Sequence, residues 1–198
     1  MKVISKLWRR WNLGRAYRGD VAAMNRLYRI KDPWRLDFAT EKVRFEGTLR
    51  LIQEGIAPHF ESILEIGCGE GLQTETLGRI ADRIVGVDAS SRAVARARQR
   101  GIPNASFRVD DFTKMNDLMP ASFGLVTACE ILYYIDDVAS ACRCMTNLAD
   151  TCLATYYQGA FQRLDVFFAD KDVEVETIMG ADCSWRVVYW RNDNCRML

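Results

Sequence analysis

The chain has 198 residues, of which 49% are hydrophobic and 27% are charged, a composition typical of a soluble globular protein. This length suits one domain with a real core better than two domains. The formal net charge of +1 gives the chain as a whole no pull toward nucleic acid or toward an anionic membrane.

The seven cysteines are scattered along the chain, odd in number and without a CxxC pair. This usage argues against a disulfide framework and against a zinc site, so we expect no metal and a cytoplasmic location. No apolar run is long enough to span a bilayer, so no transmembrane segment is expected.

Apolar side chains of the first eleven residues share one helical face, and basic side chains lie elsewhere. The apolar members are Ile4, Leu7, Trp8 and Trp11. Two interpretations stay open. The segment is either a helix docked on the domain through this face, or an interfacial helix in weak peripheral contact with an anionic membrane or substrate.

Residues 1–58 predict a helical N-terminal extension or cap, ahead of one compact domain over residues 59–198. Helical patterns cover residues 20–30 and 40–54. Asp32-Pro33-Trp34 separates these two helices, because the residue before a proline avoids helical angles.

From residue 62 onward, short apolar strands alternate with helices. The expected strands cover residues 62–67, 83–88, 105–109, 123–129 and 151–157. The expected helices cover residues 73–81, 91–100, 136–148 and 160–169. This alternation predicts right-handed crossovers and a mostly parallel sheet.

The end of the chain has a different pattern. Two strand-like runs, residues 173–179 and 184–190, are separated by a short turn that leaves no room for a helix, which predicts an antiparallel hairpin. The sequence therefore predicts a doubly wound α/β fold. Its sheet would have seven strands, mostly parallel, with the antiparallel hairpin at one edge and a helical N-terminal extension.

A glycine-rich turn follows the first expected strand and reads Glu65-Ile-Gly67-Cys-Gly69-Glu-Gly71. Glycines at this place let the backbone turn tightly and approach a ligand closely. Asp88 ends the next strand, where a carboxylate accepts hydrogen bonds from both hydroxyls of a ribose. Together the two features predict a site for a nucleoside cofactor.

Leu72 stands where the dinucleotide fingerprint has glycine or alanine, and Glu65 and Glu70 add negative charge that repels a pyrophosphate. S-adenosylmethionine has no phosphate and carries a sulfonium and an ammonium, which suit acidic residues. The pattern favours this cofactor, with S-adenosylhomocysteine as its product, over NAD. The alternative is that the glycines only turn the chain.

These residues carry a resemblance to a known family. The glycine motif, Asp88, Val109-Asp110-Asp111-Phe112 and the hairpin resemble class I S-adenosylmethionine-dependent methyltransferases over about residues 60–192. A narrower similarity is to the nodulation protein S type of N-methyltransferases, which act on the free amine of a chitooligosaccharide. It is carried by Asp32-Pro33-Trp34, Asp37, Glu41, Arg44 and Cys129-Glu130-Ile-Leu-Tyr133-Tyr134. The chain departs from the class I pattern at residues 148–151, which read Leu-Ala-Asp-Thr in place of a Pro-Gly-Gly turn.

The resemblance implies a set of cofactor-binding residues: Trp34, Arg44, Glu65, Gly67, Gly69, Gly71, Asp88, Ala89, Asp110, Asp111, Phe112 and Cys129. In this pattern the three glycines pass under the methionine part of the cofactor and Asp88 holds the ribose. Asp111 and the backbone of Phe112 meet the adenine, although Asp110 is an alternative contact and Asp111 is alternatively a helix cap.

Two further roles have open alternatives. Arg44 either pairs with the cofactor carboxylate or is a solvated helix residue. Trp34 either covers the cofactor or packs in the core.

Three residues beyond the carboxyl end of the fourth strand are candidates for catalysis, because ligands bind there in open α/β sheets. An amine acceptor must first lose its proton, and Glu130 and Tyr134 are our first candidates to assist, with Tyr133 beside them. Core packing is the alternative for the tyrosines. His59 lies near the start of the first strand and is expected to be structural.

The sequence therefore predicts a methyltransferase that acts on a small molecule or glycan, first of all on the nitrogen of a sugar amine. It predicts a monomer or homodimer with no nucleic-acid partner. The alternatives are an O-methyltransferase of a small molecule, an NAD-dependent oxidoreductase, and a non-catalytic methyltransferase-like binding subunit that the basic N-terminus would support.

Overall fold

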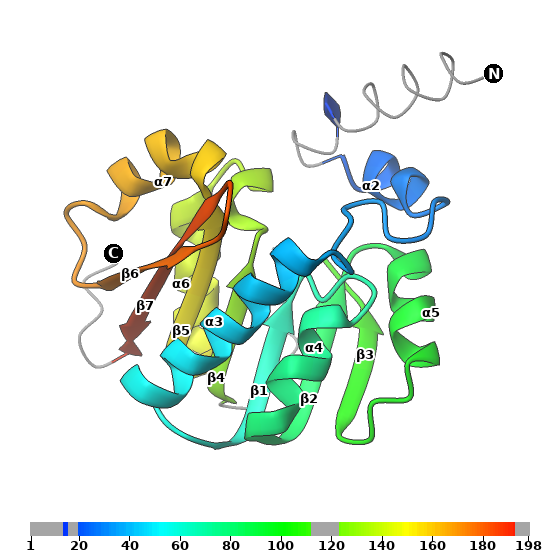
Figure 1. The fold of residues 1–198 in the computed structure, drawn as a ribbon, viewed down its shortest axis with the longest axis horizontal. Coiled ribbons are helices and arrows are strands. Elements are labelled where there is room, and N and C mark those ends of the chain that lie inside the picture. The colour runs from blue at the N-terminus through cyan, green and yellow to red at the C-terminus, as the bar shows by residue number, and fades with distance from the viewer. Residues whose placement is uncertain (1–13, 16–19, 112–122, 193–198) are drawn as a thin grey trace.

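A computed structural model describes residues 14–15, 20–111 and 123–192 (Figure 1). Two helices precede the first strand. The helix α2 (Val21–Leu27) begins at Asp20, whose Oδ1 accepts a hydrogen bond from the backbone N of Ala23 at 2.8 Å. The helix α3 (Ala39–Gly55) follows after a break at residues 28–38, as the proline there predicts.

The remaining elements alternate as expected. The strands are β1 (Phe60–Ile66), β2 (Ala81–Asp88), β3 (Ala105–Val109), β4 (Phe123–Cys129), β5 (Ala149–Tyr157), β6 (Glu174–Met179) and β7 (Ser184–Arg191). The helices are α4 (Leu72–Leu77), α5 (Ser91–Gln99), α6 (Val138–Leu148) and α7 (Phe161–Phe168), with short 3₁₀ turns over Gly78–Ile80, Leu132–Tyr134 and Gln158–Ala160.

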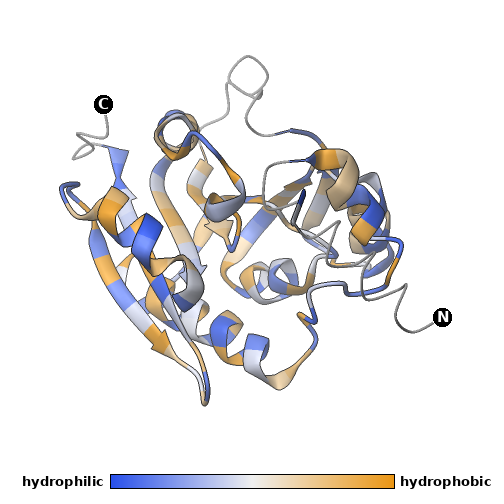
Figure 2. Ribbon diagram, turned by 90° about the horizontal axis from the view of Figure 1, so that it is seen from above, coloured by the Kyte–Doolittle hydropathy of each residue, from blue (hydrophilic) through white to orange (hydrophobic). Residues whose placement is uncertain are grey.

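The seven strands form one sheet in the order β3-β2-β1-β4-β5-β7-β6. The first five strands in this order pair in parallel, and β7 pairs antiparallel with both β5 and β6. The fold prediction is therefore confirmed, including the hairpin at the edge. Hydrophobic and hydrophilic residues alternate along this hairpin, as Figure 2 shows.

Several predicted boundaries differ from the structure by two or three residues, and one of them has a clear physical reason. The helical pattern over residues 73–81 ends before Ala81, which is the first residue of β2 and pairs with Phe60 of β1. Ala81 is buried at 5% exposure, so its place is fixed by packing in the sheet and not by its high helix propensity.

Apolar side chains fill both faces of the sheet. On one face, Leu49 and Ile52 of α3 pack with Ile63 and Leu153 of the strands, and α4 covers the same face (Figure 1). On the other face, α6 and α7 pack against β4 and β5. Within the part of the chain that the structure describes, no helix has the length and apolarity needed to cross a membrane.

The strand order reverses direction between β1 and β4, because the chain builds outward from β1 first to one side and then to the other. The carboxyl ends of β1, β2 and β4 therefore meet at one edge of the sheet. In open α/β sheets a ligand crevice lies at this point, so the fold fixes where a site is to be sought.

Candidate active site

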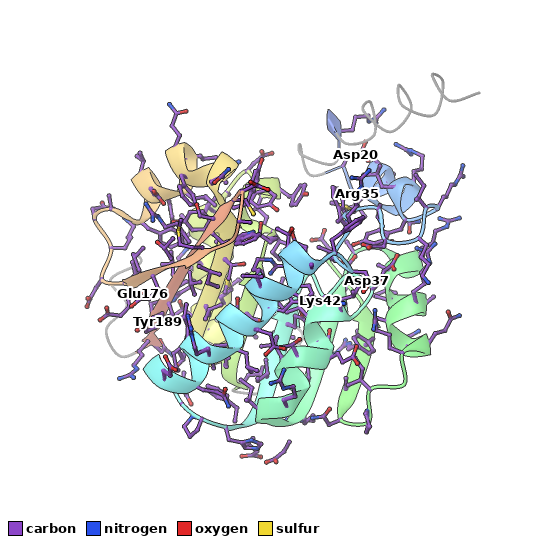
Figure 3. All side chains as sticks on the ribbon, in the orientation of Figure 1. Asp20, Arg35, Asp37, Lys42, Glu176 and Tyr189 are labelled. Atoms are coloured by element: carbon purple, nitrogen blue, oxygen red, sulfur yellow. The ribbon has the colours of Figure 1, made fainter. Side chains whose placement is uncertain are left out.

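A cavity of about 760 Å³ lies at the carboxyl ends of β1, β2 and β4. The segment from α2 to α3 borders it, and Figure 3 labels Asp20 and Arg35 in this segment, above the strand ends. Such a volume is in the range of small-molecule and cofactor sites.

The turn after β1 forms the cavity floor through Gly67 and Gly69. Both have positive φ, of 72° and 54°, and the backbone N of Gly67 donates to the carbonyl of Val87 at 2.7 Å. A Cβ on Gly67 would lie 2.4 Å from Cγ2 of Ile131. The turn therefore needs glycine at residue 67 both for its backbone angle and for space.

Gly71, the third glycine of the motif, does not line the cavity. It is the left-handed residue before α4, and a Cβ there would meet Ala97 and Phe107 at 3.3 Å. Its place therefore serves the packing of the turn against α5 and β3. The predicted cofactor contact of Gly71 has no support from this geometry.

The carboxylate of Asp88 lies at the end of β2 and lines the cavity. Its Oδ2 accepts from the backbone N of Gly69 at 3.0 Å, and its Oδ1 accepts from the backbone N of Ser90 at 2.7 Å. Burial raises the pKa of Asp88 to about 6, while the two N–H groups work in the opposite direction. The neighbouring Ala89 also lines the cavity, as predicted.

Arg44 on α3 is buried at 2% exposure, so its alternative as a solvated helix residue is wrong. Its Nε donates to Glu41 at 2.9 Å and its Nη1 donates to Oε1 of Gln73 at 2.5 Å. The guanidinium carbon of Arg44 lies 4.7 Å from the centroid of the Phe45 ring. Arg44 lines the cavity, and no hydrogen-bond partner for Nη2 is found among the described residues.

Behind Arg44 lie two predicted residues at the ends of neighbouring strands. The carboxylate of Glu65 accepts from Oγ1 of Thr74 at 2.5 Å, and burial raises the pKa of Glu65 to about 7. The thiol of Cys129 accepts from Nε2 of Gln73 at 3.1 Å, and burial raises the pKa of Cys129 to about 12. Cys129 is therefore an uncharged wall of the cavity and not a nucleophile.

Glu130, the first residue after β4, has a left-handed backbone with φ of 62°. Its carboxylate accepts from the hydroxyl of Tyr133 at 3.1 Å and from Oγ1 of Thr155 at 3.0 Å. Burial raises the pKa of Glu130, and the charge of Arg44 works in the opposite direction. An uncommon backbone angle of this kind aims the carboxylate into the cavity and is typical of functional positions.

Aromatic rings form the wall beside Glu130. The ring of Tyr134 lies 4.6 Å from that of Tyr133 and 5.9 Å from that of Trp34, and the ring of Tyr157 lies 5.4 Å from that of Tyr133. Nε1 of Trp34 donates to the hydroxyl of Tyr28 at 3.2 Å. These rings line the cavity and are only partly buried. Tyr133 and Tyr157 also pack against the buried core, so for Tyr133 core packing and a place in the cavity wall occur together.

Asp110 and Asp111 follow β3 and line the cavity on the side of Asp88. Oδ1 of Asp110 accepts from the backbone N of Asp111 at 2.9 Å, and Arg108 lies 3.7 Å from the Asp110 carboxylate. The choice between the two residues for an adenine contact stays a prediction. Phe112 lies outside the described residues.

Carboxyl groups dominate the charge of this cavity, and Arg44 is the one basic side chain among its described lining residues. The carboxyl groups belong to Asp20, Glu41, Glu65, Asp88, Asp110, Asp111, Glu130, Asp136 and Asp137. Several are paired nearby, Asp20 with Arg15 at 2.6 Å for example, but their sum still disfavours an anionic ligand. The cavity therefore suits a ligand with positive charge.

Glu70 is not part of this negative charge, contrary to the interpretation of the motif. Its carboxylate accepts from Arg96 of α5 and from the backbone N of Asp32, and it does not line the cavity. Glu70 therefore links the turn to α5 and to the segment before α3.

Sequence reasoning missed several lining residues, notably Tyr28, Gln73 and Tyr157. Gln73 could have been found, because it is a polar residue in the first turn of the helix that follows the glycine turn. Tyr28 follows α2, far from the glycine turn in sequence, and no local pattern places it there. His59 lies at the other end of the sheet, with Nε2 2.9 Å from Oδ1 of exposed Asp82, where a structural role is expected.

The comparisons with known proteins agree with this geometry. A family model described as Nodulation protein S (NodS) matches residues 19–159. A Nodulation protein S of Sinorhizobium fredii (strain NBRC 101917 / NGR234) is 34% identical over 129 residues, which are 63% of this chain and 57% of that protein. A Ubiquinone biosynthesis O-methyltransferase of Methylocella silvestris is 32% identical over 132 residues, which are 64% of this chain and 50% of that protein. The chain spans just over half the length of the Nodulation protein S relatives it matches.

Solved structures share the fold. N-methyltransferase NodS from Bradyrhizobium japonicum WM9, in complex with S-adenosyl-l-homocysteine, matches with a TM-score of 0.71 at 24% identity over 89% of this chain and 98% of that chain. Magnesium protoporphyrin IX methyltransferase from Synechocystis PCC 6803 with bound SAM matches with a TM-score of 0.59 at 14% identity, over 76% of this chain and 78% of that chain.

The close approach at Gly67 gives a testable prediction. Gly67→Ala combines a strained φ with a clash against Ile131, whereas Gly101→Ala has a similar φ of 64° and nothing within 4 Å. We expect Gly101→Ala to cost about 1 kcal/mol of unfolding free energy, and Gly67→Ala about 2 kcal/mol more. Urea unfolding of both variants measures this, and equal losses would contradict the tight packing of the turn.

Proposed function

Because this chain belongs to the nodulation protein S family, we propose that it is an S-adenosylmethionine-dependent methyltransferase acting on an amine of a small molecule or glycan. One observation carries the proposal. A cavity at the point where the strand order reverses is lined by nine carboxyl groups and one guanidinium, with glycines at its floor. Such a site suits a cofactor with a sulfonium and an ammonium, and it disfavours the phosphates of NAD.

The residues present fit this cofactor. Asp88 would accept from the two ribose hydroxyls, since each of its oxygens has one lone pair left after its backbone bond. The backbone of Gly67 and Gly69 leaves room for the methionine part. Nη2 of Arg44 would donate to the cofactor carboxylate, and Glu65 lies nearby to balance its ammonium.

The same reasoning extends the binding site around the adenine and above the cofactor. Asp110 or Asp111 would accept a hydrogen bond from the adenine amino group. The backbone of Ala89 would lie beside the adenosine. Trp34 and Cys129 would supply uncharged walls. When bound, S-adenosylmethionine supplies a methyl group on a positively charged sulfur, which is already a good leaving centre.

The chain's own task is then to hold the acceptor and remove its proton. We assign Glu130 as the base, because a buried carboxyl with a raised pKa binds a proton more readily near neutral pH. The hydroxyls of Tyr133 and Thr155 keep the carboxylate in place. Tyr134 and its ring neighbours exclude water, and their faces suit a positively charged amine.

A second candidate is O-methylation of a small molecule. It is favoured by the 32% identity to the Ubiquinone biosynthesis O-methyltransferase of Methylocella silvestris. The negative charge of the cavity favours the amine instead, because a neutral hydroxyl acceptor gains nothing from nine carboxyl groups. A non-catalytic binding subunit is disfavoured because Glu130 and Asp88 both lie in the cavity.

We further propose a cytoplasmic protein, monomeric or homodimeric, with a small-molecule or oligosaccharide acceptor and no nucleic-acid partner. The cysteine usage supports the location, because scattered cysteines without a CxxC pair are typical of a reducing compartment. The apolar face predicted for the first eleven residues lies outside the described residues, and its weak contact with a membrane stays a prediction.

Loss of the Asp88 carboxylate tests the cofactor site. We expect Asp88→Ala to weaken binding of S-adenosylhomocysteine about 10- to 100-fold, because two hydrogen bonds to a charged acceptor disappear. Isothermal titration calorimetry measures the affinity. Asp82→Asn, an exposed carboxyl at the opposite end of the sheet, is the control and should bind as the native chain does. A native chain that does not bind at millimolar ligand would refute the function.

Neutralising Glu130 tests the chemistry. We expect Glu130→Gln to lower kcat for methyl transfer to a glucosamine oligomer about 10²- to 10⁴-fold, the usual contribution of a general base. Its affinity for S-adenosylhomocysteine should stay within about threefold of the native value, since the residue lies on the acceptor side. Exposed Glu61→Gln on β1 serves as the control. Unchanged kcat in Glu130→Gln would rule out this assignment.

A further inference from the structure

The loop that carries the acceptor side of the cavity is held from outside by one arginine. Arg163 on α7 donates from Nη1 to the carbonyl of Tyr133 at 3.3 Å, and from Nη2 to the carbonyls of Ile135 and Asp136 at 2.5 Å and 3.4 Å. These three carbonyls lie within four residues of the loop between β4 and α6. A single planar guanidinium therefore bridges the second half of this loop.

The helix that carries Arg163 is itself firmly attached to the sheet. Asp165, two residues further on, accepts from the hydroxyl of Tyr156 at 2.8 Å and from Arg186 of β7 at 3.4 Å. The guanidinium of Arg186 also lies 4.5 Å from the ring centroid of Phe161. Leu164 is fully buried on the other side of the helix. The helix α7 is therefore a fixed support and not a mobile flap.

The loop packs against the core through Leu132 and Ile135, and the backbone N of Glu130 donates to the carbonyl of Thr155 at 2.9 Å. Its regular structure is one short 3₁₀ turn, in which the backbone N of Tyr134 donates to the carbonyl of Ile131 at 2.9 Å. On the cavity side the loop presents Glu130, with its left-handed backbone, and the rings of Tyr133 and Tyr134. The positions of these groups therefore depend both on this packing and on where Arg163 holds the loop backbone.

The bonds of Arg163 are directed at carbonyl groups and not at the nearby carboxylates. Asp137, at the end of this loop, uses its Oδ1 to accept from the backbone N of Ser140 at the start of α6, and Asp165 accepts from Tyr156 and Arg186. An arginine that only balanced surface charge would pair with a carboxylate. Bonds to three carbonyls of one loop fix backbone position instead.

We propose that Arg163 is a positioning residue that holds the loop over residues 130–136 in the conformation in which Glu130 and Tyr134 receive the acceptor. The edge hairpin is thereby connected to the site. Arg186 of the hairpin bonds to Asp165 of α7, and Arg163 of the same helix bonds to the loop. The role rests on the proposed methyl transfer, because it concerns the acceptor half of that site. The cofactor half, around Asp88, adjoins this loop through Ile131, which faces Gly67, whereas the hydrogen bonds of Arg163 lie further along the loop, at residues 133–136.

The experiment compares Arg163→Ala, Arg163→Lys and the matched control Arg98→Ala. Arg98 on α5 also donates from two nitrogens to a backbone carbonyl, that of Phe107 at 2.7 Å, but on the far side of the sheet. Each variant is assayed for the KM of a glucosamine oligomer, for kcat, and for the Kd of S-adenosylhomocysteine. Hydrogen–deuterium exchange of residues 131–137 gives a readout that needs no activity.

For Arg163→Ala we expect the acceptor KM to rise and kcat to fall, each about five- to tenfold, because a displaced loop misaligns the acceptor. The Kd of S-adenosylhomocysteine should stay within twofold, and exchange over residues 131–137 should accelerate. Arg163→Lys keeps one donor group and should recover part of the loss. Arg98→Ala should leave the acceptor KM and this exchange unchanged.

Three results would overturn the proposal. Unchanged KM and kcat in Arg163→Ala would show that the loop holds its place alone. A rise in the Kd of S-adenosylhomocysteine equal to that in KM would indicate general destabilisation. The same kinetic loss in Arg98→Ala would remove the link to this loop. If the native chain binds no S-adenosylhomocysteine, the proposed function itself fails, which is a different and separately visible outcome.

Discussion

Nine carboxyl groups line one cavity in which Arg44 is the one described basic side chain, and burial raises the pKa of three of them, Glu65, Asp88 and Glu130. Burial raises the pKa of Asp88 to about 6 and that of Glu65 to about 7, because a carboxylate loses hydration in the cavity wall. The protein keeps these groups at a cost in stability. A positively charged ligand would stabilise the ionised carboxylates and so offset part of that cost. The cavity therefore prefers a cationic ligand to an anionic one.

The fold supplies the position of these charges. The reversal of strand order between β1 and β4 brings the ends of three parallel strands together. A carboxyl residue lies at or next to each of these ends: Glu65 one residue before the end of β1, Asp88 at the end of β2 and Glu130 directly after β4. Backbone N–H groups of Gly69 and Ser90 hold Asp88 with its remaining lone pairs toward the cavity. The antiparallel hairpin contributes from the opposite edge, since Arg186 supports α7 and α7 supports the loop after Glu130.

Much of this fold could be predicted from the sequence, because strands and helices follow local patterns. The ends of β3 and β4 were predicted to the residue, and the glycine turn with Asp88 has a spacing that few other folds share. Side-chain direction was harder. Glu70 and Gly71 belong to the motif in sequence, yet both face α5, since the turn rotates them away from the cavity.

Residues that reach the site from distant elements escaped local patterns for a different reason. Tyr28 and Gln73 contribute through packing that depends on how α2, α3 and the sheet come together, and no spacing encodes this. Arg44 was open between a pairing with the cofactor carboxylate and a solvated place on its helix, and only the fold, with its partners Glu41 and Gln73, excludes the solvated place. Arg163 has an ordinary helical neighbourhood in the sequence, so its three carbonyl partners appear only in the fold.

Proton release on cofactor binding tests the central claim most directly. At pH 6.5 the carboxyls of Asp88 and Glu65 are partly protonated, and a bound cation lowers their pKa, so protons leave the protein. Calorimetry in two buffers of different ionisation enthalpy counts these protons for S-adenosylmethionine and for S-adenosylhomocysteine, which lacks the sulfonium charge. We expect the binding of S-adenosylmethionine to release on the order of half a proton more from the protein than the binding of S-adenosylhomocysteine does. Equal release, or proton uptake with S-adenosylmethionine, would contradict the account.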